Sequence, residues 1–177
     1  MTGPVGSRGV TSRGELLADW VADVRRGIER ELARSTDGSL HRRPAPGMNS
    51  IGDTVWHVAR WLDLVAMWLA DAAPATQHWI ADGWVERTGY DPRGTGTDGL
   101  GAISGYTFAE VEAVPHLRAD QLRAYLAAVC DDLIPKLRAC DDAAAQRHTG
   151  VVQGAFGHLG EIAALRTLFE RRGSRAS

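Results

Sequence analysis

The sequence has few cysteines, almost no net charge and no long hydrophobic run. Its two cysteines, Cys130 and Cys140, lie on one predicted helix and are separated by about 15 Å of helical rise. This separation is too large for a disulfide, and reduced thiols are typical of cytoplasmic proteins. No His or Lys lies at an adjacent helical spacing to activate Cys130, which favours buried packing over a nucleophilic role. The sequence therefore predicts a cytoplasmic protein without disulfides.

Lys and Arg number 20 and Asp and Glu number 22, which gives a net charge of −2. Nucleic acid is not expected as a partner, because its phosphates normally require a basic face. No stretch approaches the roughly 18 uncharged apolar residues of a membrane-spanning helix, so no membrane partner is expected either. The length of 177 residues fits one domain. We expect a flexible N-terminal arm over residues 1–13 and a single domain over residues 14–172.

Apolar residues recur every three or four positions in four segments, which is the period of an amphipathic helix. The second segment follows Ser50, and Asp53 three residues later completes a weak form of the capping box. In the third segment Pro135 removes one backbone donor and is expected to bend the helix. Four amphipathic helices predict an all-α four-helix bundle. The helices are expected at about residues 14–34, 51–72, 122–137 and 151–169.

Residues 73–118 form a long connection between the second and third predicted helices, which implies a crossover. It is expected to contain a short helical piece around residues 78–87 and another that opens with a capping box of Thr107 and Glu110. Three glycines of the intervening stretch TGYDPRGTGTDGLG match the spacing G-x-G-x-x-G. No strand precedes them and no Lys follows, so the stretch is interpreted as a flexible lid rather than a dinucleotide site.

Two histidines, His57 and His158, lie in the second and fourth predicted helices, where facing helices bring them together. They would supply two ligands to a divalent zinc or nickel ion, but Gly154, one turn before His158, offers no third. Asp53 and Glu161 each lie one turn from a histidine and are candidates to complete the ligand set or to orient a ring nitrogen. The alternative is a pair of core histidines, each satisfied by one hydrogen bond.

Gly154 also removes a side chain from a position that is expected to face inward. A glycine in a helix interior costs about 1 kcal/mol relative to alanine, so its presence requires a reason. Two explanations stay open: room for a ligand, or close packing of the fourth helix against the second. Gly157 and Gly160 lie nearby and favour close packing.

Aromatic and cationic residues suggest a binding cavity beside the histidines. Trp61, Trp68 and Trp84 are predicted to wall an apolar cavity for a flat small molecule, although core or dimer-interface packing also explains them. Arginines near the expected mouth would suit a carboxylate such as that of a thiol cofactor, although surface arginines are commonly just solvated. These arginines are Arg60, Arg87 and Arg93.

The runs PGMNSIGDTVWHVARWLDLVAMWL, GYTFAEVEAV and GAFGHLGEIAALRTL resemble the DinB-like superfamily over nearly the whole chain. The resemblance implies an up-down-down-up bundle, often a homodimer, with zinc or nickel held by three residues of two helices. The first ligand matches His57 and the last matches His158. The middle ligand, usually His or Glu, matches Gly154. The superfamily includes transferases and isomerases that use a low-molecular-weight thiol, mycothiol or bacillithiol, so such a cofactor is implied.

Three functional hypotheses follow. The first is a divergent metal-dependent transferase, isomerase or hydrolase in which Asp53 or Glu161 supplies the third ligand. The second is a metal-free bundle whose histidines perform acid–base chemistry on, or hydrogen-bond to, an apolar or aromatic small molecule bound near Gly154, with Trp61, Trp84 and Arg87 as further contacts. The third is a non-catalytic dimeric bundle with a stress-related role.

Overall fold

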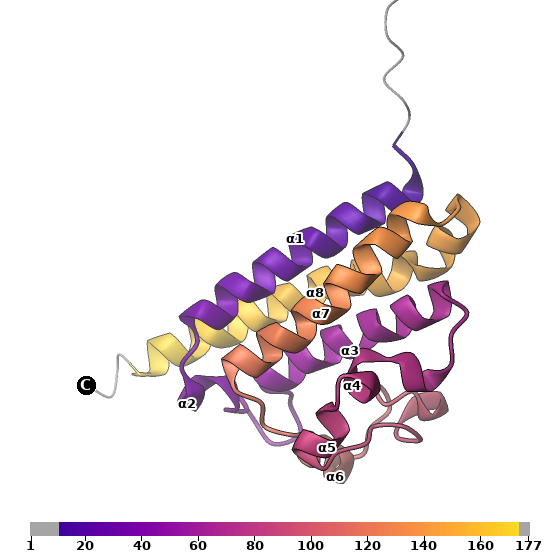
Figure 1. Cartoon of the computed structure of the whole chain (residues 1–177). Coiled ribbons are helices and arrows are strands. Elements are labelled where there is room, and N and C mark those ends of the chain that lie inside the picture. Colours follow the sequence, from indigo (N-terminus) through magenta and orange to yellow (C-terminus); the bar gives the residue numbers. More distant parts are fainter. Residues whose placement is uncertain (1–10, 174–177) are drawn as a thin grey trace, which may run out of the picture.

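The computed structural model describes residues 11–173 and contains helices only, apart from one isolated bridge between Thr95 and Leu100. Four long helices, α1, α3, α7 and α8, make the body of the molecule, and short helices fill the connections (Figure 1). The α-helices are α1 (Arg13–Arg34), α2 (Asp37–Leu40), α3 (Ile51–Leu69), α4 (His78–Ala81), α5 (Trp84–Thr88), α6 (Phe108–Glu112), α7 (Ala119–Ala139) and α8 (Asp142–Gly173). Two short 3₁₀ turns, Pro74–Thr76 and Thr97–Gly99, lie within the crossover.

The four long helices form an up-down-down-up bundle. Helix α1 packs against α7 and α8, and α3 packs against the same two helices. Figure 1 shows α3 and α7 running in one direction and α1 and α8 in the other. Parallel neighbours cannot be joined by a short turn, so the chain between α3 and α7 must return along the bundle. The predicted fold class and the predicted crossover are both confirmed.

Side-chain caps fix where the helices begin. The predicted pair of Ser50 and Asp53 forms a complete capping box at the start of α3, and Thr107 with Glu110 does the same for α6. Each such cap stabilises a helix by about 1 kcal/mol because it satisfies backbone donors that lack partners within the helix. Helix α7 continues through Pro135 to Ala139, so this proline does not end the helix.

The predicted apolar stripes form the core. The side chains of Leu17, Val24, Ile28 and Leu32 in α1 are at most 1% exposed, and the stripes of α3, α7 and α8 are buried against them. Cys130 lies in the same core and is free, as predicted. Burial raises the pKa of its thiol to about 12, which excludes a thiolate nucleophile at neutral pH.

Several element boundaries differ from the expected ones. Helix α3 ends at Leu69 rather than near Ala72, and α8 begins at Asp142 rather than Val151. The expected helical piece around residues 78–87 is broken into α4 and α5 at Gly83, whose φ of 73° is the left-handed conformation that glycine favours. The short helix α2 lies between the first two expected helices, where no further helix was expected. Most of the expected N-terminal arm, residues 1–10, lies outside the described residues.

Candidate functional site

His57 of α3 and His158 of α8 meet, as the helical pattern predicted. Their Nε2 atoms are 3.1 Å apart, and the two rings are nearly perpendicular, with an interplanar angle of 80°. His57 is largely enclosed by protein, whereas the side chain of His158 is 35% exposed. The pair therefore combines a sheltered ring with one that solvent reaches.

The second nitrogen of each ring faces an oxygen atom. The Nδ1–H of His57 donates to the backbone carbonyl of Ala102, and the Nδ1–H of His158 donates to Oε2 of Glu161 at 3.0 Å. Carbonyl and carboxylate oxygens accept hydrogen bonds only, so both Nδ1 atoms carry a hydrogen. If both rings were neutral, each Nε2 would present a lone pair to the other. A separation of 3.1 Å fits an arrangement in which a proton or a metal ion lies between the nitrogens.

The surroundings distinguish the two rings. Burial lowers the pKa of His57, the hydrogen bond to Ala102 partly offsets this, and the nearby His158 lowers it further. His57 is therefore the neutral ring. The Glu161 carboxylate accepts from the Nδ1–H of His158 and so orients this ring. In the arrangement that satisfies every nitrogen, His158 carries both hydrogens and its Nε2–H donates to the Nε2 lone pair of His57.

A cavity of about 220 Å³ adjoins the histidine pair, between α3 and α8. Its walls are mostly apolar and it is partly open to solvent. Gly154 lines it but is exposed, so the expectation that this position faces inward is wrong. A Cβ atom at Gly154 would meet nothing within 4 Å, and the same holds for Gly157 and Gly160. Close helix packing is therefore the wrong explanation for these glycines. Residues that line the cavity include His57, Val58, Trp61, Val151, Gly154 and His158.

The donor set at the histidine pair fits two metal ligands but not three. At a metal–nitrogen distance of about 2.0–2.1 Å, two Nε2 atoms 3.1 Å apart make an angle of about 100° at a shared ion. This angle is compatible with the tetrahedral geometry that zinc prefers. Asp53, however, is 2% exposed, accepts hydrogen bonds from Ser50 and pairs with Arg43 at 2.9 Å. Glu161 contacts the Nδ1 of His158 and not the Nε2 side.

Over residues 11–173 no group of three or more His, Cys, Asp or Glu side chains is placed to hold a metal ion. A catalytic zinc site normally has three protein ligands and an open position. Glu161 therefore has the orienting role among its two predicted ones, and Asp53 is a structural cap. The residues present do not fit the three-ligand centre that the resemblance implied.

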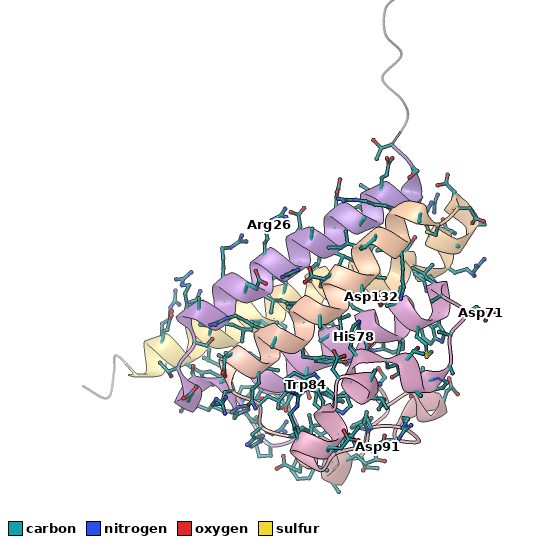
Figure 2. The ribbon with its side chains drawn as sticks, viewed as in Figure 1. Arg26, Asp71, His78, Trp84, Asp91 and Asp132 are labelled. Carbon is teal, nitrogen blue, oxygen red and sulfur yellow. The ribbon has the colours of Figure 1, made fainter. Side chains whose placement is uncertain are left out.

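Trp84 and Arg87 lie away from the histidine pair. Trp84 is 7% exposed and stacks on Trp79 with ring centroids 5.7 Å apart, and Arg87 covers the Trp84 ring at 4.1 Å. Figure 2 shows Trp84 on the side of the crossover helices α4 and α5. Neither residue lines the cavity, whereas Trp61 does. The prediction that Trp84 and Arg87 share a site with Trp61 is therefore not supported by their positions.

The other predicted contacts also have different positions. Trp68 is tilted toward Trp61 and stacks on His148, but it does not line the cavity. Arg93 pairs with Asp91 on the surface. Arg60 is fully buried, so it is not a cation at a mouth. The arginines expected to receive a carboxylate are therefore engaged elsewhere.

The crossover loop is tied to the histidine face of α3. His57, Arg60 and Trp61 lie within one turn of α3, and each donates a hydrogen bond to the loop segment 101–104. The Nε of Arg60 donates to a backbone carbonyl at 3.1 Å, and the Nε1 of Trp61 donates to a serine hydroxyl at 3.3 Å. Sequence reasoning missed this contact, because the acceptor of the His57 bond is a backbone atom. The loop is thus a fixed part of the site rather than a free lid.

Ile103 adopts an unusual backbone conformation beside the carbonyl that His57 contacts. Its φ is 67°, in the left-handed region that β-branched residues rarely occupy, and its side chain is 8% exposed. Such a conformation costs about 1–3 kcal/mol and persists only where surrounding contacts enforce it. The contacts of Arg60 and Trp61 on either side of Ile103 provide this enforcement.

Two histidines outside the site make stability depend on pH. Burial is the main cause of a lowered pKa at both His41 and His148, with further lowering from His116 and Arg147 respectively. Because their folded pKa values lie below the reference value of 6.5, the unfolded chain binds more protons as the pH falls through 6.5. We expect the free energy of unfolding, measured by urea denaturation, to decrease between pH 7.5 and pH 5.5. His148→Gln should flatten this decrease, and equal stability at both pH values would contradict the prediction.

The fold and site define a class: an up-down-down-up bundle in which histidines of α3 and α8 meet beside a cavity. The chain belongs to the DinB superfamily, whose family model matches residues 21–164. A solved structure described as the conserved protein of a locus from Enterococcus faecalis is similar over 90% of this chain and 98% of its own, with a TM-score of 0.71 and 21% identity. No curated protein matches the chain.

Among residues 11–173, no helix has both the length and the apolar character needed to cross a bilayer. The homodimer, the thiol cofactor and the cytoplasmic location stay predictions.

Proposed function

We propose that this protein is a small-molecule enzyme that uses His57 and His158 as a paired general base and general acid. The observation that carries the proposal is the 3.1 Å contact between the two Nε2 atoms, each ring having its Nδ1–H engaged by an oxygen. One shared proton satisfies this geometry. The two histidines then offer an acceptor, the Nε2 lone pair of His57, next to a donor, the Nε2–H of His158.

Such a pair suits proton transfer next to a carbonyl group. The Nε2 of His57 accepts a proton from carbon while the Nε2–H of His158 donates to the carbonyl oxygen, which gives an enol. The reverse steps return the proton to the same carbon or to another one. Glu161 accepts a hydrogen bond from the Nδ1–H of His158 and orients that ring, and the Ala102 carbonyl holds His57 in the tautomer that a base requires.

The apolar cavity supports this chemistry in two ways. A substrate that fills it displaces water from around the reacting atoms, which strengthens hydrogen bonds to the histidines, and the walls hold the substrate against them. General acid–base catalysis by positioned side chains typically contributes about 10²–10⁴-fold to a rate. No step is assigned to a metal ion, because the donor set does not fit a three-ligand centre.

Deuterium exchange into the methyl group of acetophenone in D₂O, followed by ¹H NMR, tests this proposal. This small aryl ketone requires one proton removal from carbon and one proton donation to oxygen. We expect the protein to accelerate exchange about 100-fold or more over free imidazole at the same histidine concentration. His57→Gln should abolish the acceleration, because glutamine keeps a hydrogen-bonding side chain but cannot accept the proton.

His78→Gln is the matched control. His78 lies on α4 and contacts Asp82 and Asp132, at the side of the molecule shown in Figure 2. It does not line the cavity, so this variant should keep the full rate. Equal rates for the wild type and His57→Gln would contradict the acid–base role.

A further inference from the structure

The histidine pair presents a donor and an acceptor side by side, and this arrangement defines the chemical group that it recognises. We propose that the cavity binds a neutral, single-ring aromatic molecule whose hydroxyl group, phenolic or enolic, bridges His57 and His158. This inference rests on the proposed function, because the shared proton creates the donor–acceptor pair. The two Nε2 atoms are 3.1 Å apart, so one ligand oxygen can lie about 2.8–3.0 Å from both of them, within hydrogen-bond distance of each.

A hydroxyl group is the best match among common polar groups. On binding, the hydroxyl replaces the direct hydrogen bond between the two rings: its O–H donates to the Nε2 lone pair of His57, and its oxygen accepts from the Nε2–H of His158. A carboxylate only accepts, so it would leave the lone pair of His57 facing a negative charge. An ammonium group only donates and would face the N–H of His158. A carboxylate or an ammonium group therefore meets a group of its own kind, an acceptor against an acceptor or a donor against a donor, at the histidine pair.

The charge of the cavity also disfavours anions. None of the residues that line it is a lysine or an arginine, and the carboxylate of Glu161 already accepts from the Nδ1–H of His158. Arg60 is close in sequence but donates to Asp63, Gln77 and loop carbonyls instead. An anionic ligand would therefore lose its hydration with only the Nε2–H of His158 to replace it.

The remaining walls suit one aromatic ring. Trp61 offers an aromatic face, and the aliphatic side chains Val58, Leu62 and Val151 complete the enclosure. The volume of about 220 Å³ exceeds the roughly 150 Å³ of an apolar cavity that holds benzene, so one ring with a small substituent fits. Gly154 and Gly150 keep the α8 side open, because a side chain at either position would project into free space beside the cavity.

Calorimetric titration with three methyl-substituted benzenes near neutral pH tests the proposal. The compounds p-cresol, toluene and 4-methylbenzoate share a ring and differ only in the polar group. We expect p-cresol to bind at least about 10-fold more tightly than either of the others, the gain of two good hydrogen bonds at a sheltered site. Equal binding of p-cresol and toluene, or tighter binding of 4-methylbenzoate, would overturn the assignment.

Variants separate the hydroxyl contact from the ring contact. His57→Phe should bind toluene but lose the preference for p-cresol, because the acceptor of the hydroxyl proton is gone. Gly154→Leu should weaken binding of p-cresol at least about 10-fold by occupying the cavity. Gly157→Leu is its matched control, since both glycines have free space at Cβ and only Gly154 lines the cavity. Equal weakening by the two leucine variants would show that p-cresol binds elsewhere.

The two tests fail independently. If acetophenone exchange is absent but p-cresol keeps its preference, the ligand class stands and the protein is a binding module. If exchange is present but p-cresol binds no better than toluene, the acid–base function stands and the ligand class is wrong. His57→Phe unfolding would be visible in thermal denaturation, and in that case His158→Gln replaces it as the test of the same preference.

Discussion

Gly154→His is expected to convert the histidine pair into a tight divalent-metal site. The new side chain lies one turn before His158 on the same face of α8, and a Cβ atom there meets nothing within 4 Å. A third imidazole would join two Nε2 atoms that already converge at 3.1 Å. Three preplaced ligands complete a tetrahedral site with one open position, and we expect zinc affinity to rise roughly 100-fold or more.

Competition with a chromophoric zinc chelator measures this gain. Gly157→His is the matched control, because Gly157 also has free space at Cβ but lies outside the cavity wall. It should leave the zinc affinity near that of the wild type. A wild-type protein that already binds one zinc ion as tightly as Gly154→His would show that another group supplies the third ligand.

Arg60→Met should destabilise the protein by about 3–5 kcal/mol, the usual result of breaking a buried ion pair from one side. The guanidinium of Arg60 is fully buried and donates to the carboxylate of Asp63 at 3.2 Å, to Gln77 at 2.6 Å and to the carbonyl of Gly101 at 3.1 Å. Methionine fills much of the volume but leaves these acceptors with fewer donors. The loop segment 101–104 would also lose one of its three ties to α3.

Urea denaturation with a linear extrapolation measures this loss, and Arg93→Met is the control. Arg93 pairs only with its neighbour Asp91 on the surface, so its replacement should cost less than about 1 kcal/mol. Similar losses for the two variants would contradict the account of Arg60. Residual Asp63 contacts, to Tyr125 at 2.8 Å and to the backbone N–H of His78 at 2.9 Å, explain why Arg60→Met should still fold.

The sequence was sufficient for the bundle because each long helix carries its own apolar stripe. The stripe residues of α1 and α7 are buried as the helical period requires; they include Leu17, Val24, Ile28, Leu32, Leu122, Leu126, Val129, Leu133 and Leu137. Helix ends were less predictable, because local capping decides them. Helix α8 extends back to Asp142, where Asp141 accepts from the backbone N–H of Ala144, through a segment whose alanines carry little periodic signal.

The candidate site was only partly predictable for a different reason. The meeting of His57 and His158 follows from helical periodicity in two packed helices. The Ala102 carbonyl does not, because a backbone acceptor on a crossover loop leaves no trace in residue types. Arg60 was misplaced for a related reason. Asp63 lies one turn further along the same helix, but Gln77 and the carbonyl of Gly101 meet Arg60 only in the folded chain.

The state of the imidazole nitrogens tests the central claim most directly. Long-range ¹H–¹⁵N NMR of protein purified without a metal-affinity step, with elemental analysis of the same sample, reports on each nitrogen of His57 and His158. We predict hydrogens on both Nδ1 atoms, one proton shared by the two Nε2 atoms, and no stoichiometric metal. One equivalent of zinc or nickel, with both Nε2 resonances shifted to metal-bound values and the metal lost in His57→Gln, would contradict the account.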